Sequence, residues 1–148
     1  MLLTAKILLT LATLGYSAIP LAFDSNKTHW FNDSWTPHGR FHCVWQVMSY
    51  VYMALIALGL IWTASSVNWQ IWLSAGLAAC AYGGFWTAVA LRKKLGLALV
   101  DDVNGVPPFM LPVLGECDAN VTLFTTAVIL LGTGAGALSL AAATVAAN

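Results

Sequence analysis

The chain has 148 residues, of which 59% are hydrophobic and only 8% are charged, and its formal net charge is zero. Soluble globular domains carry about 25% charged residues and about 45–50% apolar ones, so this chain cannot cover itself with side chains that favour water. A zero net charge also leaves no basic surface for nucleic acid. The composition therefore predicts an integral membrane protein with the lipid bilayer around it and no nucleic-acid partner.

Four apolar segments are long enough to cross the hydrocarbon core, which takes about 20 helical residues. They cover residues 2–23, 42–64, 69–91 and 121–145. We expect residues 1–148 to form one domain of the all-α class, an integral membrane four-helix bundle. An alternative for the first segment is a cleaved signal peptide, because Lys6 precedes an apolar stretch that leads to the small residues Ser17 and Ala18.

The connection between the second and third segments, residues 65–68, permits only a tight antiparallel hairpin. The loops at 24–41 and 92–120 must therefore lie on the same membrane face. Five of the six Lys and Arg residues fall in these two loops, and loops rich in Lys and Arg stay in the cytosol. We expect the polar loops to be concentrated on one membrane face, with the histidine-containing loop in the cytosol and both termini outside.

The last three segments carry no acidic, basic or histidine residue at mid-membrane, which argues against a channel or pump. Small residues let membrane helices approach closely. We therefore expect Gly132 and Gly136, four apart in the last segment, and the Gly83-Gly84 pair to pack against neighbouring helices. The prolines in loop 92–120 exclude a regular helix, so this apolar loop should lie in the membrane interface or act as a lid beside an entrance for a lipid-like molecule.

All three histidines lie between residues 25 and 45. Thr36-Pro37 is a helix-start signal, a hydroxyl N-cap followed by proline at the first helical position, so the second helix should begin near Pro37. His38 and His42 then share one helix face. Residues with polar tips continue this stripe into the membrane: Trp45, Ser49 and Tyr52.

Three interpretations of the histidines remain open. His38 and His42 could bind a divalent metal, with His29 or a carboxylate as the third ligand. A histidine with Asp or Asn neighbours could instead act as a general acid or base near neutral pH. Alternatively, these groups could be structural, with hydrogen bonds that tie the loop to the helix ends, since unpaired polar groups are costly beside hydrocarbon.

The chain reads His-x-Phe-Asn-x-x-Trp-x-Pro-His-x-Arg-Phe-His from His29 to His42. This segment resembles the signature of a family of small four-span integral membrane proteins of bacteria and fungi, in which a second proline occupies the position of Thr36. The family has no known function, so the resemblance implies the fold and marks the segment without supplying a reaction. The layout is also similar to small membrane isomerases of the sterol-isomerase type and to four-span oxygenases of polyketide pathways, whose motifs are absent here.

The leading hypothesis is an enzyme, an acid–base or metal-assisted isomerase, cyclase or oxygenase, that acts on a lipophilic substrate entering between the helices. His38 or His42 would move a proton or hold the metal, while Arg40 and Asn32 would polarise an oxygen. The full candidate site comprises Asp24, His29, Asn32, His38, Arg40 and His42, completed by Asp101, Asp102, Glu116 or Asp118. The alternative is a non-catalytic ligand-binding or accessory protein in which these residues form a structural cap.

Overall fold

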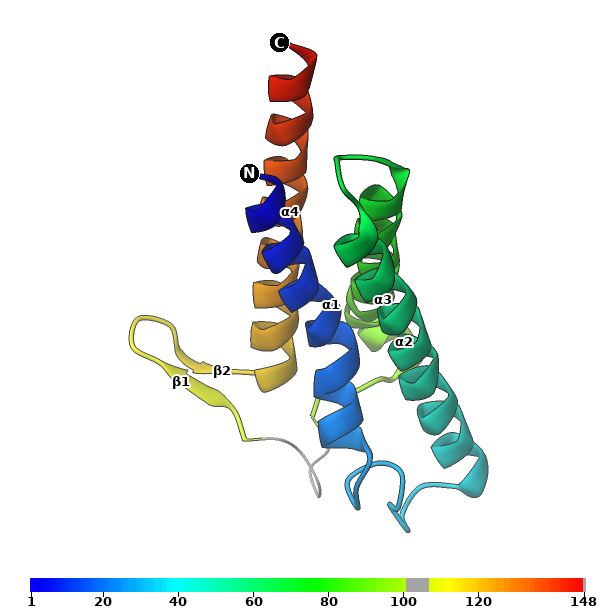
Figure 1. The fold of residues 1–148 in the computed structure, drawn as a ribbon. Helices are drawn as coiled ribbons and strands as arrows, with labels where there is room; N and C mark the ends of the chain where they lie inside the picture. Colours follow the sequence, from blue (N-terminus) through cyan, green and yellow to red (C-terminus); the bar gives the residue numbers. More distant parts are fainter. Residues whose placement is uncertain (101–106, 148) are drawn as a thin grey trace.

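The computed structural model describes residues 1–100 and 107–147, which form four long helices and one short β-hairpin (Figure 1). The helices are α1 (Leu2–Asp24), α2 (Pro37–Thr63), α3 (Trp69–Leu95) and α4 (Ala119–Ala146). The strands β1 (Phe109–Leu111) and β2 (Gly115–Cys117) pair antiparallel. All four helices are long and apolar enough to cross a membrane, which confirms the predicted all-α four-helix membrane bundle.

Helix α1 is the centre of the bundle, and it packs most extensively against α4 and α2. Both termini and the turn between α2 and α3 lie toward one end, which we call the terminal end (Figure 1). The loop between α1 and α2 lies at the opposite end, the loop end, and the β-hairpin projects sideways from the start of α4 (Figure 1). The helix directions therefore match those inferred from the short connection at 65–68.

Local signals define where the helices start. The Thr36 hydroxyl accepts a hydrogen bond from the Gly39 amide at 3.1 Å, and Pro37 occupies the first turn, so the predicted start of the second helix is confirmed. Asp118 caps α4 in the same way, because its Oδ1 accepts from the Val121 amide at 2.8 Å. Such caps satisfy backbone N–H groups that have no partner inside the helix.

Close packing near the middle of the bundle depends on Gly15. The Tyr82 hydroxyl on α3 donates a hydrogen bond to the Ala12 carbonyl on α1. A Cβ atom on Gly15 would lie only 2.6 Å from the hydroxyl oxygen of Tyr82. A larger residue at Gly15 would therefore displace the phenol that joins these two helices.

The glycine that packs α4 against α1 is Gly134, because a Cβ there would lie 3.2 Å from the Cβ of Leu8 and from a methyl group of Leu9. The expectation that other glycines pack between helices is wrong. Within the described chain, a Cβ would meet no atom within 4 Å at Gly83, Gly84, Gly132 and Gly136. Helix α4 turns the face with Ala127, Gly134 and Leu138 inward, so Gly132 and Gly136 point elsewhere.

The ammonium group of Lys6 has partners at the terminal end of the bundle. Its Nζ donates to the Ala64 carbonyl at 2.6 Å and lies 5.7 Å from the centre of the Trp62 ring. The ammonium group thus pairs with a carbonyl at the C-terminal end of α2, where a positive charge is favourable. This contact joins α1 to the end of α2.

Candidate functional site

A cavity of about 650 Å³ opens at the loop end of the bundle. Its walls come from all four helices and from the segments beside them. Phe85 on α3 and Phe124 on α4 stack with ring centroids 4.2 Å apart and form part of the apolar wall. The polar groups that line it are Asp24, His29, Gln46, Tyr50, Asp118 and Asn120. The cavity is therefore amphiphilic, with the size expected of a small-molecule site.

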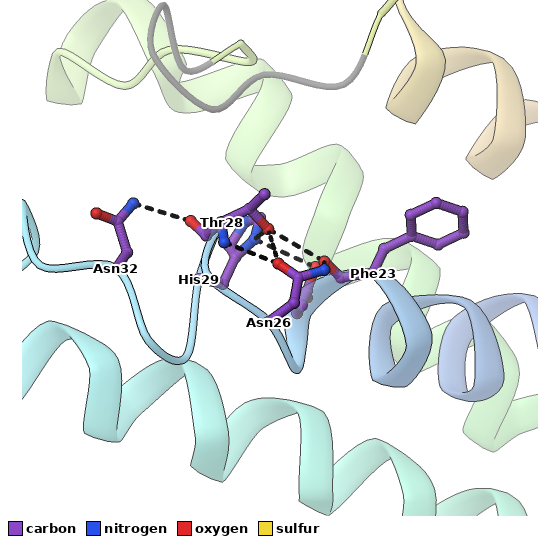
Figure 2. A network of polar contacts seen from close by, with 6 residues as sticks. Phe23, Asn26, Thr28, His29 and Asn32 are labelled. Carbon is purple, nitrogen blue, oxygen red and sulfur yellow. Dashed lines mark hydrogen bonds and ion pairs between the residues drawn. The ribbon is translucent and has the colours of Figure 1, made fainter.

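His29 lines this cavity and is held by the segment that leaves α1 (Figure 2). Its Nδ1 lies 2.8 Å from the Thr28 hydroxyl oxygen and 3.6 Å from Oδ1 of Asp24, the last residue of α1. The Trp35 indole packs against the imidazole in an edge-to-face arrangement, with centroids 5.2 Å apart. Within residues 1–100 and 107–147, no group bonds to the second nitrogen, Nε2.

The hydrogen-bond network assigns the tautomer of His29. The Thr28 hydroxyl lies 2.7 Å from Oδ1 of Asn26 and 3.1 Å from the Phe23 carbonyl, and both of these oxygens can only accept (Figure 2). Its single hydrogen is therefore directed to one of them, and His29 Nδ1 must donate to the hydroxyl oxygen. The free Nε2 then carries a lone pair, which is the arrangement of a general base.

Asn32 supports the loop and does not line the cavity. It is buried, with 4% of its surface exposed. Its Nδ2 donates to the Thr28 carbonyl at 2.9 Å, and its Oδ1 accepts from the amide and the hydroxyl of Ser34 at 2.9 and 2.6 Å. These bonds engage both ends of the amide, so Asn32 fixes the segment that carries His29.

His38 and His42 are exposed residues of α2 and do not line the cavity. Their Nε2 atoms lie 3.0 Å apart. Arg40 forms an ion pair at 3.7 Å with the exposed Asp33, and it too lies outside the cavity lining. The structure therefore separates the predicted residues, because the loop directs His29 to the cavity while the helix presents His38 and His42 on its exposed surface.

A three-histidine metal site is not assembled. Across the described part of the chain, no three His, Cys, Asp or Glu side chains come together as ligands. Of the acidic residues considered as additional members, Asp118 lines the cavity and caps α4, while Glu116 is exposed on β2. Asp101 and Asp102 lie outside the described residues.

Gln46 and Tyr50 are cavity residues that the sequence analysis missed. They lie one turn apart on α2, and the Gln46 amide donates to the Tyr50 hydroxyl at 3.2 Å. The predicted polar stripe instead runs through Trp45 and Tyr52, which are both exposed. The sequence does contain a signal for these residues. Gln46, Tyr50 and the small residue Ala54 are spaced four apart, so they lie on one face of the helix.

The fold and the cavity define a small multi-pass membrane protein with an amphiphilic site at one end of a four-helix bundle. No family model, no curated protein and no solved structure matches the chain.

Proposed function

We propose that the protein is a membrane enzyme that binds a lipophilic molecule in the cavity and moves a proton on it with His29. One observation carries this proposal: an imidazole held through Nδ1 by Thr28, with the Asp24 carboxylate beside it, lines an amphiphilic cavity of about 650 Å³. The Thr28 hydroxyl orients the ring, and the Asp24 carboxylate, 3.6 Å from the same nitrogen, lies close enough to stabilise a positive charge on the imidazole during acid–base chemistry.

The chemistry follows from the free nitrogen. Nε2 of His29 removes a proton from the substrate, and the Asp24 carboxylate beside Nδ1 stabilises the imidazolium that forms. The same nitrogen then returns the proton to another atom of the substrate, so an isomerisation or a cyclisation needs no further reactant. The Tyr50 hydroxyl and the Gln46 amide, both in the cavity lining, supply hydrogen bonds to a substrate oxygen.

The apolar walls indicate the class of substrate. Phe23, Phe85 and Phe124 line the cavity together with Ile19 and Leu123, whereas the polar lining is confined to a few groups. A molecule with a hydrocarbon body and an oxygen-bearing head matches this distribution, and it would reach the site from the bilayer. We also propose that the His29–His42 signature joins this chain to the four-span family that it resembles.

We further propose that the loop end faces the cytosol. Arg92, Lys93 and Lys94 lie in the last turn of α3, and Lys27 and Arg40 lie in or beside the loop between α1 and α2. The positive-inside rule assigns such loops to the cytosolic side. The polar residues of the cavity would then lie at the cytosolic membrane surface.

The test compares lipophilic extracts of cells that express the wild-type chain or its His29→Gln variant. The expected result is a product signal with the wild-type chain and accumulation of its precursor with His29→Gln, resolved by chromatography and mass spectrometry because isomers share a mass. Lys27→Gln, an exposed change two residues earlier in the loop, is the matched control and should behave as wild type.

The alternative is a non-catalytic protein that binds the same molecule. The hydrogen bonds that Asn26 and Asn32 form within the loop favour this alternative. Such bonds would also be expected if the loop were a rigid structural cap over the helix ends. In that case, extracts of wild type and His29→Gln would be identical, while native mass spectrometry of the purified protein would still detect a bound lipophilic molecule. That outcome would exclude the enzyme.

A further inference from the structure

The two histidines outside the cavity form a geometrically defined pair. His38 and His42 lie four residues apart in the first turns of α2, and both are exposed. Their Nε2 atoms are 3.0 Å apart, and their ring planes are nearly perpendicular, at 83°. The Thr36 cap and Pro37 begin this helix, so regular helical geometry and not a flexible loop sets the spacing.

This spacing matches two adjacent positions around a metal ion. Two nitrogens 3.0 Å apart, each bonded to one ion at about 2.0–2.1 Å, subtend an angle of roughly 95° at that ion. Cu²⁺ binds nitrogen ligands more tightly than Ni²⁺ or Zn²⁺ does. An angle near 90° is that of square-planar and tetragonal ions, Cu²⁺ and Ni²⁺.

We propose that His38 and His42 chelate a divalent transition-metal ion of the Cu²⁺ or Ni²⁺ type on the exposed surface of α2. In the metal-free pair, one Nε2 donates its hydrogen to the lone pair of the other. In the metal-bound pair, both imidazoles carry their hydrogen on Nδ1 and direct their Nε2 lone pairs to the ion. Because both side chains are exposed, the rings can rotate to this arrangement, and water completes the coordination.

The surroundings support a two-ligand site. Phe41 stacks parallel to the His38 ring at 6.4 Å between centroids, and Trp45 stacks on His42 at 5.8 Å. These rings flank the two imidazoles. The nearby charged residue Arg40 is paired with Asp33. The site shares no residue with the cavity, so the inference goes beyond the proposed function and does not depend on it.

The test uses the full chain, purified in detergent with an affinity tag that lacks histidine and stripped of metal with a chelator. After addition of CuCl₂ and removal of unbound metal, we expect one copper per chain by elemental analysis and a tetragonal electron paramagnetic resonance spectrum with coupling to two nitrogens. Copper should also quench the fluorescence of Trp45, which stacks on His42. His38→Ala and His42→Ala should each lose the bound copper.

Matched variants make the result specific. Both histidines are exposed, so their alanine variants should keep the wild-type circular dichroism spectrum. Trp45→Phe should keep the copper and lose much of the quenching. His29→Gln should keep the copper, and copper loss in that variant would point to a three-histidine site and overturn the proposal. Retention of copper by the His38→Ala/His42→Ala double variant, or tighter binding of Zn²⁺ than of Cu²⁺, would also overturn it.

Discussion

Nδ1 of His29 lies 3.6 Å from Oδ1 of Asp24 at the point where α1 ends. The last helical residue therefore supplies the carboxylate, and a short turn closed by Asn26 and Thr28 brings the imidazole back toward it. This relationship engages Nδ1 and leaves Nε2 without a partner among the described residues. The proposed acid–base role depends on this division between the two nitrogens.

Asp24→Asn should lower product formation by less than the roughly 10²–10⁴-fold loss typical of removing an acid–base group. An amide cannot stabilise the imidazolium as a carboxylate does, but Thr28 still holds Nδ1. Product in lipophilic extracts is the measurement. Asp33→Asn, which changes an exposed carboxylate in the same loop, should have no effect. Equal losses in the two variants would contradict a specific role for Asp24.

Gly84→Phe should reduce binding of the lipophilic molecule, because Gly84 lines the cavity and a Cβ there would meet open space. The added ring would occupy cavity volume, and its Cβ would meet no neighbouring atom within 4 Å. The neighbouring Gly83 also has open space around it but does not line the cavity, so Gly83→Phe is the matched control. Native mass spectrometry of the purified variants measures the bound fraction. Equal occupancy in both variants would place the ligand elsewhere.

Gly134→Leu should lower the free energy of unfolding by about 1–3 kcal/mol, the usual cost of overpacking a contact between helices. Its side chain would collide with Leu8 and Leu9 on α1, whereas Gly132→Leu, two residues away on the same helix, would extend into open space. Unfolding in mixed detergents, followed by circular dichroism, measures the difference. A larger loss for Gly132→Leu would show that α4 packs through its other face.

The orientation in the membrane can be measured by cysteine labelling. In a chain whose own three cysteines are replaced, Lys27→Cys should resist a membrane-impermeant maleimide applied to intact cells, because we assign its loop to the cytosol. Ser66→Cys, exposed in the turn between α2 and α3 at the terminal end, should react. The reverse labelling pattern would invert the proposed topology while leaving the bundle unchanged.

The features of the fold that the sequence predicts are those set by residues close together in the chain. The number and direction of the spans depend on apolar length and on the short connection at 65–68, and the start of α2 depends on Thr36 and Pro37. The β-hairpin at Phe109–Cys117 was not anticipated. Its prolines excluded a helix, but the pairing of Phe109 with Cys117 is a contact between residues eight positions apart, which no local pattern specified.

The tertiary structure decided which face of each helix points inward. In a soluble protein, the apolar face marks the core, but in a membrane an apolar side chain is as stable against lipid as against another helix. The sequence therefore marked the histidine segment without separating His29 from His38 and His42. The rotation of the helices around α1 placed Gln46 and Tyr50 in the cavity lining, buried Gly134, and left Trp45, Gly132 and the His38–His42 pair outside the lining and exposed. That rotation, set by contacts between helices, determines which polar residues reach the cavity.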